Sequence, residues 1–508
     1  MLSPDCLNPD AVRRSVPRSA ILLCCAALAA CASPNLEPPE LAQNLPSTFA
    51  AGGVSAQPDD DWWNRFGDPQ LAALIEEAVS ESPQVGQALA RVEQARAQGR
   101  IQQADQLPQV SVSASASKAQ QTLGGLGPIG AIPGAGGEGE DAPTSFTTEN
   151  YDLSANVSWE TDLFGALRAR SAAAREEFLA SEANLRAARQ AVAAQVARSY
   201  FALVEARAQV ALSEEVVETF GEIARQVGNR ADVGIAPPND KLLAISNLES
   251  ARAGLQQRRE SVERLTRQLE LLLRDYPSGT QATTALLPPV PEPPPTGLPV
   301  DLLTRRPDVA ASMFQLRAAG FRTAAAQRSL LPSLNLTGSA GTASNELGDL
   351  LDGDFFVWSI AGRLLQPIFQ GGRLRAQVRL AEGQRDEASE RYVETLLTAL
   401  SEVETALAID DDLAAREAAL VAAAEASQQS VDISFNRYRA GIDPFLTVLQ
   451  SQQGALDARS AVIATRRARL ENRVALHLAL GGGFGSTATA PQFTDGVTTA
   501  QVPQENDR

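Results

Sequence analysis

The sequence predicts an elongated α+β protein built from two tandem structural repeats, each a β-hairpin plus long antiparallel coiled-coil helices. Two long windows contain no proline, from Thr144 to Ala236 and from Ile368 to Asp443, and both are dense in helix-favouring Ala, Leu, Glu, Gln and Arg. Two pairs of shorter segments show the period of two that is typical of strands. Because these features recur in the same order, we infer an internal duplication.

The first 30 residues have the layout of a secretory signal peptide. Arg13, Arg14 and Arg18 precede an apolar run over 20–30, which is too short to span a bilayer stably. The chain has four cysteines, none beyond Cys31, so the remaining sequence has no disulfide framework and no cysteine metal site.

Two interpretations of this signal remain open. One is an ordinary signal peptide, cleaved after small residues. The other is a lipoprotein signal, because Leu28-Ala29-Ala30-Cys31 resembles the bacterial lipobox. That resemblance implies an S-diacylglycerol and an N-acyl chain such as palmitate on Cys31, and Ala32 implies sorting to the outer membrane. Two or more acyl chains anchor a protein stably.

Each repeat is expected to contain the same long elements in the same order. In the first repeat, residues 61–287, we predict strands at about 107–118 and 148–162, a long helix at 165–231 and a return helix at 239–275. In the second repeat, residues 301–483, the corresponding elements are strands at about 332–343 and 354–366, a long helix at 371–438 and a return helix at 444–480. A Pro-rich bridge at 288–300 joins the repeats, a linker occupies 31–60, and 484–508 forms a disordered tail.

The strands predict contact with a membrane. Val110 and Val112 alternate with Ser111 and Ser113, and the other segments show comparable apolar and polar alternation, with a mobile loop at 123–143. Strands of about ten residues with this pattern suit membrane β-barrels, although soluble hairpins look similar. Four strands are too few to close a spanning barrel, so several chains must contribute.

The long helices carry heptad seams. The first seams are Val196, Leu203, Val210 and Val217, and beside them Val192, Ser199, Ala206, Ser213 and Phe220. The second helix repeats the spacing with Val393, Leu400, Leu407, Ala414 and Val421. Each helix would be about 100 Å long. Taken alone, either helix favours a soluble coiled-coil rod.

Composition and motifs exclude several function classes. A net charge of −17 argues against a nucleic-acid partner. We expect no enzyme, because no nucleophile elbow, phosphate loop or zinc motif occurs. The single histidine, His477, lies in an apolar run near the end of the last predicted helix, and it is expected to be a packed or helix-end residue rather than a ligand. The acidic runs 59–61 and 410–412 are expected to be solvated surface. We assign packing to Trp62 and Trp63.

The chain resembles the bacterial outer-membrane-factor family, the TolC/OprM-like exit ducts, in its lipoprotein (NodT-type) branch. The resemblance extends from about Trp62 to Gly483 and rests on seven motifs in order. These are Trp62-Trp63 with Phe66 and Asp68-Pro69, Ala197-Arg198-Ser199-Tyr200-Phe201-Ala202-Leu203, Arg305-Arg306-Pro307-Asp308-Val309, Pro367-Ile368-Phe369-Gln370-Gly371-Gly372-Arg373-Leu374, Glu402-Val403-Glu404-Thr405-Ala406-Leu407, Arg437-Tyr438-Arg439-Ala440-Gly441 and Ala479-Leu480-Gly481-Gly482-Gly483.

The resemblance implies a homotrimer whose twelve strands form one β-barrel in outer-membrane lipid, continued by an α-helical barrel across the periplasm. It also implies a periplasmic adaptor (membrane fusion) protein and an inner-membrane pump of the proton-driven RND type. The expected function is the exit duct of a tripartite efflux system for small molecules, including multidrug resistance. Alternatives are the same duct in protein secretion or metal export, and a non-conducting structural coiled-coil lipoprotein.

The family's periplasmic gate lies at the turns after the two long helices. The matching positions here are Asn239, Asp240, Tyr438, Asp443, Leu446, Thr447 and Gln450. Thr447 and Gln450 stand where family members often carry acidic rings, so we expect a less charged constriction that depends on Leu446 and on hydrogen bonds among Asn239, Asp240 and Tyr438. An alternative role for Asp240 is helix capping.

Overall fold

The computed structural model describes residues 39, 45–52, 61–122 and 145–483. The predicted signal peptide, Cys31, most of the linker, the loop 123–143 and the tail lie outside these described residues. The helices and strands are η1 (Trp62–Phe66), α3 (Pro69–Glu81), α4 (Pro83–Ala104), β1 (Gln109–Thr122), β2 (Ser145–Thr161), α5 (Ala166–Asp232), α6 (Pro238–Leu272), η3 (Pro299–Asp301), α7 (Leu302–Arg305), α8 (Pro307–Arg328), β3 (Ser333–Ser344), η4 (Leu347–Leu351), η5 (Gly353–Phe355), β4 (Phe356–Leu365), α9 (Arg373–Arg439) and α10 (Phe445–Ala479).

The described residues form two compact units. One unit includes residues 80–122, 145–188 and 307–401, and contains α4, α8 and the four described strands. The other includes 47–52, 61–79, 189–306 and 402–483, and contains α6 and α10. The helices α5 and α9 each contribute one part to each unit.

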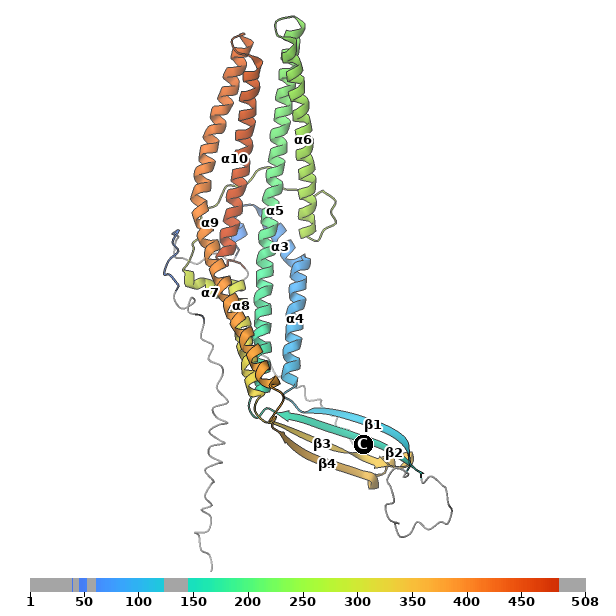
Figure 1. Ribbon diagram of the computed structural model, residues 1–508. Helices are drawn as coiled ribbons and strands as arrows, with labels where there is room; N and C mark the ends of the chain where they lie inside the picture. The colour runs from blue at the N-terminus through green and yellow to red at the C-terminus, as the bar shows by residue number, and fades with distance from the viewer. Residues whose placement is uncertain (1–38, 40–44, 53–60, 123–144, 484–508) are drawn as a thin grey trace, which may run out of the picture. The chain divides into compact units, whose positions relative to one another are not determined.

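The strands of the first unit form one antiparallel sheet in the order β1-β2-β3-β4 (Figure 1). The link between the two predicted hairpins is the pairing of β2 with β3, in which Trp159 lies opposite Leu336. Because β1 and β4 each pair on one side only, both edges of the sheet are open.

The two faces of this sheet differ in chemistry, because side chains alternate along each strand. The register places polar residues together on one face, which we call the polar face: Gln109, Ser111, Ser113, Ser115, Ser154, Asn156, Ser158, Glu160, Asn335, Thr337, Ser339, Ser359 and Arg363. The opposite, apolar face carries Val110, Val112, Leu153, Val157, Trp159, Leu334, Leu336, Phe356, Trp358, Ile360 and Leu364.

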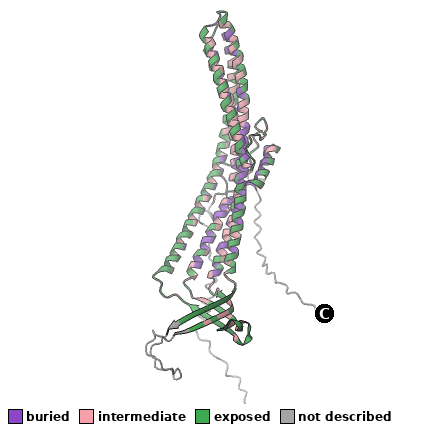
Figure 2. Ribbon diagram, turned by 90° about the vertical axis from the view of Figure 1, so that its right-hand side faces the viewer, coloured by how far each residue is buried: buried purple, intermediate pink, exposed green. Residues whose placement is uncertain are grey.

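Both faces of the sheet are largely exposed (Figure 2). Every residue of β4 is exposed, including Trp358 at 68% and Ile360 at 80%. On the polar face, side chains hydrogen-bond across strands, as between Ser339 and Ser359 at 2.8 Å. Exposed aromatic and branched side chains on one sheet face indicate a surface that a partner or lipid covers.

Small residues allow the helices of the first unit to approach closely. Ala169 of α5 packs with Ala324 and Ala325 of α8. At the start of α5, the Arg328 guanidinium donates to the carbonyl oxygen of Gly165 at 2.8 Å. Gly165 has a φ of 82°, which glycine adopts without strain.

In the second unit, aromatic residues near the N-terminus of the described chain fill the core. Trp62 is fully buried and its ring stacks on His477, with 5.6 Å between the ring centroids. The hydroxyl of buried Tyr200 donates to Asp68 Oδ2 at 2.6 Å. The predictions that Trp62, Trp63 and His477 are packing residues are therefore confirmed.

The boundaries of the strands and helices differ from the expected ones by a few residues. The first strand extends to Thr122 rather than 118, and the second begins at Ser145 rather than 148. The return helix α6 ends at Leu272, because Arg274 takes a φ of 67° and the chain leaves the helical path. Periodicity does not locate such ends, since the flanking residues suit either state.

The predicted seam of the second long helix is wrong by about one position. Val393, Leu400 and Leu407 are only half-buried, and Val421 is 39% exposed. The residues buried instead keep the heptad spacing and are Tyr392, Leu396, Ala399, Val403 and Ala406. The helix carries two apolar seams, and which one is buried depends on where the neighbouring helices lie.

The expectation that residues 410–412 are solvated is wrong for Asp410. Its carboxylate accepts from the guanidinium of Arg473 at 3.1 Å, and Arg473 is only 1% exposed. Burial lowers the pKa of Arg473, and the Asp410 carboxylate opposes that shift. Asp410 thus compensates a buried charge, which its place in an acidic run does not indicate.

Candidate gate at the helix turns

Two turns of matching backbone geometry join the long helices to their return helices. The first turn, residues 233–237, joins α5 to α6, and the second turn, residues 440–444, joins α9 to α10. In the first turn the Ile235 amide donates to the Arg230 carbonyl at 2.8 Å, and in the second the Ile442 amide donates to the Arg437 carbonyl at 3.0 Å. The αL residue that each turn requires is a glycine, Gly234 with φ 77° and Gly441 with φ 74°.

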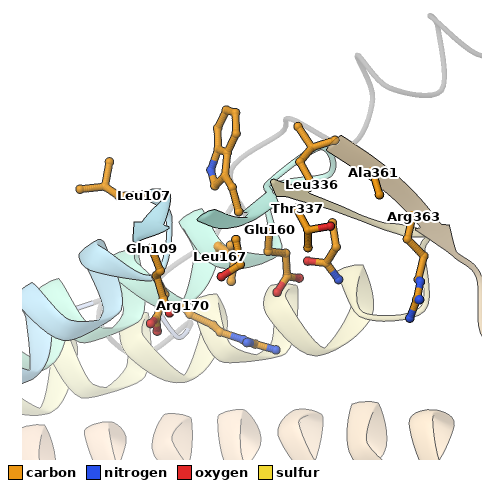
Figure 3. Close-up of a pocket in the computed structure, with 13 residues that line it drawn as sticks. Leu107, Gln109, Glu160, Leu167, Arg170, Leu336, Thr337, Ala361 and Arg363 are labelled. Atoms are coloured by element: carbon orange, nitrogen blue, oxygen red, sulfur yellow. The ribbon is translucent and has the colours of Figure 1, made fainter. Parts of the chain in front are cut away.

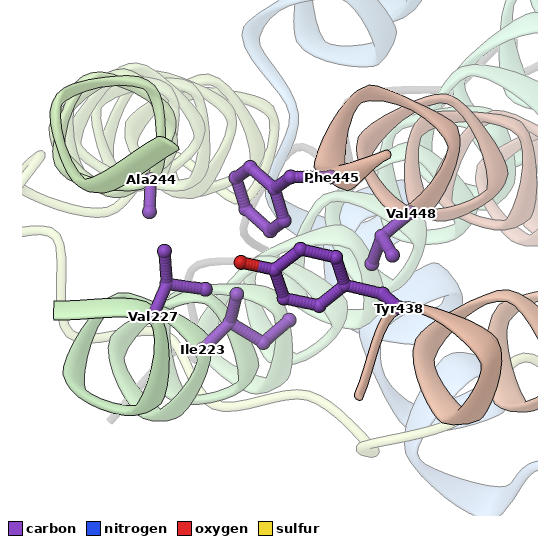
Figure 4. Packing of buried hydrophobic residues seen from close by; sticks show 6 residues of the cluster. All are labelled: Ile223, Val227, Ala244, Tyr438, Phe445 and Val448. Atoms are coloured by element: carbon purple, nitrogen blue, oxygen red, sulfur yellow. The ribbon is translucent and has the colours of Figure 1, made fainter. Parts of the chain in front are cut away.

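A shared apolar cluster lies near the two turns. It joins residues of both helix pairs, and we call it the tip cluster: Ile223, Val227, Ala244, Tyr438, Phe445 and Val448 (Figure 4). The rings of Tyr438 and Phe445 lie 5.3 Å apart, tilted at 49°. Val227 and Val448 are fully buried, so the two hairpins are held together by burial of apolar area.

Polar contacts at the edge of the tip cluster also join the hairpins. The Tyr438 hydroxyl donates to Asp240 Oδ2 at 3.3 Å. The guanidinium of Arg230 lies over the Tyr438 ring, 5.6 Å from its centroid, and donates to the Arg439 carbonyl at 3.2 Å. Arg230, Asp240 and Tyr438 thus form a contact between the two hairpins, which we call the cross-hairpin latch.

Electrostatics keeps the Tyr438 hydroxyl in its donor form. Burial raises the pKa of Tyr438, and the nearby Asp240 carboxylate raises it further, while Arg230 acts in the opposite direction. A neutral phenol is therefore maintained well above neutral pH, and it can donate to a carboxylate.

Asp443 has a local partner instead. Both of its carboxylate oxygens accept from the Arg437 guanidinium, at 2.7 and 3.0 Å. These hydrogen bonds lower the pKa of Asp443, so it is ionised at neutral pH. Asp443 therefore braces its own turn, and it contributes no bond to the other hairpin among the described residues.

The remaining predicted gate residues lie at the tips without joining the latch. Leu446 is 55% exposed, Gln450 is exposed and Thr447 is half-buried. The expected hydrogen bonds among Asn239, Asp240 and Tyr438 are found only between the last two, because the exposed Asn239 side chain makes none among the described residues.

The alternative that Asp240 caps a helix is wrong. The cap position of α6 is Pro237, with no side-chain capping bond, and Asp240 lies within the first turn of the helix. A carboxylate there is favoured by the helix dipole, and its side chain is free to reach Tyr438.

Arg230 is the latch residue that sequence reasoning missed. The available signal was the repeat itself, since Asn229-Arg230 recurs as Asn436-Arg437. That signal marks a shared turn but does not indicate that the two arginines have different partners.

The described part of the chain shows two further absences. It contains no group of three His, Cys, Asp or Glu residues arranged to hold a metal ion. No helix in it combines the length and apolar content required to cross a membrane.

Comparison with known proteins identifies the family. The outer membrane efflux protein model matches residues 74–273 and 298–482. Outer membrane protein OprJ of Pseudomonas aeruginosa is 33% identical over 432 residues, covering 84% of this chain and 86% of OprJ. The probable outer membrane lipoprotein SilC of Salmonella typhimurium is 28% identical over 434 residues, covering 85% and 90%. The solved CmeC outer membrane channel of Campylobacter jejuni superposes with a TM-score of 0.82 at 28% identity, covering 90% of this chain and 95% of CmeC.

All three relatives are outer membrane proteins by name, and CmeC is named as a channel; they match most of the chain in sequence and, for CmeC, in fold. The duplicated arrangement of β-hairpin, long helix and return helix is thus the architecture of a known family. The protein belongs to the outer membrane efflux protein family.

Proposed function

We propose that three copies of this outer-membrane efflux protein form one exit duct, which passes small molecules from a periplasmic adaptor and an inner-membrane pump to the outside. The observation that carries this proposal is the open four-stranded sheet with one apolar and one polar face.

The open edges of the sheet require partners. Lipid offers no hydrogen bonds to the free edges of β1 and β4, and barrels that span membranes have at least about eight strands. Three copies supply twelve strands and leave no edge. The apolar face then contacts lipid, and the polar face lines the interior.

On the resemblance to the outer-membrane-factor family, the helices would continue the duct on the periplasmic side. The long helices α5 and α9 have 67 residues each, and the return helices α6 and α10 have 35 each. Three copies would bring three latches to the end of the duct. There, Tyr438, Asp240 and Arg230 would keep neighbouring hairpins together and the passage narrow until a partner separates them.

The turns offer a surface for the adaptor protein. Four apolar side chains are exposed there, Val233 at 69%, Ile235 at 66%, Ile442 at 62% and Leu446 at 55%. Exposed branched residues clustered at a tip are typical of a docking surface. We also propose that the pump behind the adaptor is of the proton-driven RND type, because the resemblance to the outer-membrane-factor family implies such a pump.

The lipid anchor belongs to the same proposal. Cys31 would carry an S-diacylglycerol and an N-acyl chain, which attach the protein to the outer membrane in addition to the barrel. Mass spectrometry of the mature N-terminal peptide tests this point. An unmodified peptide starting at Cys31, or cleavage elsewhere, would overturn it.

Planar-bilayer recording of the purified protein tests the duct itself. We expect low conductance from the native chain and a higher, stable conductance from Tyr438→Phe, because that change removes the bond to Asp240. Tyr276→Phe is the matched control, because Tyr276 is 86% exposed and lies outside the tip cluster. If neither the native protein nor Tyr438→Phe ever conducted, the structural coiled-coil alternative would be favoured.

The number of copies and the cargo have their own tests. Sedimentation in detergent should give a mass of about three chains, and a monomer would contradict barrel closure. Deleting the gene should raise sensitivity to small apolar drugs. If metal sensitivity or loss of a secreted protein appeared instead, the duct would serve metal export or secretion.

A further inference from the structure

A pocket of about 530 Å³ lies at the foot of the sheet, where the strands meet α4 and α5. It opens on the polar face. Its lining includes the charged residues Asp105, Glu160, Arg170 and Arg363 and the amides Gln109 and Asn335. Its volume is in the range of small-molecule sites. We call it the foot pocket.

The register of the sheet sets the spacing of two opposite charges. Glu160 of β2 pairs with Asn335 of β3, and Asn335 pairs with Arg363 of β4. The two charged residues are therefore two strands apart, about 10 Å between their Cα atoms. Neither Glu160 nor Arg363 forms an ion pair or a side-chain hydrogen bond within the described residues.

The foot pocket also receives charges from the helical side. Arg170 comes from the start of α5 and Asp105 from the end of α4. Figure 3 shows Glu160 and Arg363 projecting from one side of the sheet, with Arg170 extending along the same side. The pocket thus holds two carboxylates and two guanidiniums, with the apolar side chains of Leu107 and Leu167 in its lining.

The guanidinium of Arg363 is unusual for its surroundings. Arg363 is the one basic residue on the polar face over the described strands, because Lys118, the other basic strand residue, lies on the opposite face and pairs with Glu149. The chain as a whole carries a net charge of −17. On the polar face of the described strands, positive charge is therefore confined to the foot pocket.

We propose that the foot pocket is a transit site for zwitterionic small molecules with an apolar body. The carboxylate of such a solute binds Arg363 and Arg170, and its ammonium binds Glu160 and Asp105. Leu107 and Leu167 contact the apolar body. A solute with one charge leaves one pair of protein charges unmatched, so it binds less well.

This inference rests on the proposed function, because a transit site requires that solutes enter the duct. Binding to the purified, full-length protein tests it with three probes that share an indole ring: zwitterionic tryptophan, cationic tryptamine and anionic indole-3-propionate. Isothermal titration at neutral pH should show tryptophan binding tighter than either analogue by about threefold, the size expected for partly solvated ion pairs.

Charge-removing variants show whether the foot pocket causes the preference. Arg363→Gln and Glu160→Gln should each abolish the advantage of tryptophan. Lys118→Gln and Glu149→Gln are the matched controls, because they remove the same charges from the same sheet on its other face, and they should leave the preference unchanged. Thermal unfolding of each variant, compared with that of the native protein, separates loss of the site from failure to fold.

The two proposals fail in different ways. Equal binding of the three probes, or a preference that survives both Arg363→Gln and Glu160→Gln, overturns the transit site even if the protein conducts. A protein that prefers tryptophan yet never conducts in bilayers keeps the binding site and overturns the duct.

Discussion

The two turns of the molecule have the same backbone but different side chains. Relative to the shared glycines Gly234 and Gly441, Arg230 corresponds to Arg437. Arg437 pairs with Asp443 in its own turn, whereas the first repeat has the buried Ala236 at that place. Arg230 has no carboxylate in its own turn, and it contacts the second hairpin instead.

The other two residues of the latch also differ between the repeats. Tyr438 corresponds to Ala231, and Asp240 corresponds to Thr447. One repeat thus provides the aromatic ring and hydroxyl, and the other provides the cation and the carboxylate. Duplication preserved the turn, and substitutions at its edges made the two copies complementary. The cross-hairpin contact depends on these differences between the repeats.

The largest effect is expected from Arg230→Ala, which breaks the complementarity directly. The change removes the contact with the Tyr438 ring and the hydrogen bond to Arg439. We expect bilayer conductance to rise about tenfold, because contacts of this kind contribute about 1 to 2 kcal/mol to a closed state.

Arg225→Ala is the matched control for that change. Arg225 lies on the same helix and pairs with Glu222 one turn away, at an exposed position. Its conductance should equal that of the native protein. An equal rise in both variants would mean that loss of positive charge, rather than loss of the latch, opens the duct.

A smaller effect is expected from Ala236→Asp, which makes the first turn resemble the second. The new carboxylate would offer Arg230 a partner in its own turn, as Asp443 does for Arg437. We expect conductance to rise about fivefold, since a partly exposed ion pair competes with the latch without removing it.

The isosteric variant Ala236→Asn separates charge from size. Its asparagine side chain has nearly the same shape as the aspartate of Ala236→Asp but carries no charge. The Ala236→Asn protein should therefore conduct less than the Ala236→Asp protein. Thermal unfolding of both variants checks that the buried position accepts the larger side chain. If the two conducted alike, competition for Arg230 would not be the cause.

Tyr438→Phe is expected to have the next effect. It removes one hydrogen bond to Asp240 and keeps the ring in the tip cluster. We expect conductance to rise about threefold, because a hydrogen bond as long as 3.3 Å contributes about 0.6 kcal/mol, at the low end of the usual range.

The pH dependence of the native latch checks the same bond. The pKa of Tyr438 is raised in the folded protein, so its stabilisation is fully present below the ordinary tyrosine pKa and is lost as the pH rises through the raised value. Conductance of the native protein should rise at strongly alkaline pH. A comparable alkaline rise in Tyr438→Phe would assign the effect to another group.

The smallest effect concerns Asp443 and stays within the second turn. Asp443→Asn removes the brace on Arg437, so amide exchange at Ile442 should become faster, while exchange at the equivalent Ile235 remains unchanged.

The pH dependence of the native protein checks the same ion pair. The pKa of Asp443 is lowered, so its stabilisation is present above the ordinary aspartate pKa and is lost as the pH falls through the lowered value. The Ile442 rate, corrected for intrinsic exchange, should be flat from pH 8 to about 5. A faster rate at Ile235 in the variant would show that the turns are coupled.

The local pattern of the sequence determined much of the fold. Absence of proline and helix-favouring composition gave α5 and α9 to within two residues at each end, because those signals act over many residues. Alternation along the strands predicted which residues share a face, since neighbouring side chains in a strand must point in opposite directions. Recurrence of Gly234-Ile235 as Gly441-Ile442 indicated two equivalent turns.

Only the tertiary structure decided which partners these residues find. The seam of α9 is buried along Tyr392 and Leu396 because neighbouring helices cover that face, and a heptad pattern does not include those neighbours. Arg230 and Arg437 occupy equivalent places, yet their partners differ because contacts form between segments far apart in the chain. The spacing of Glu160 and Arg363 likewise depends on the pairing of β2, β3 and β4. Periodicity is local in the chain, whereas pairing depends on distances in space, and the latch and the foot pocket both depend on such pairing.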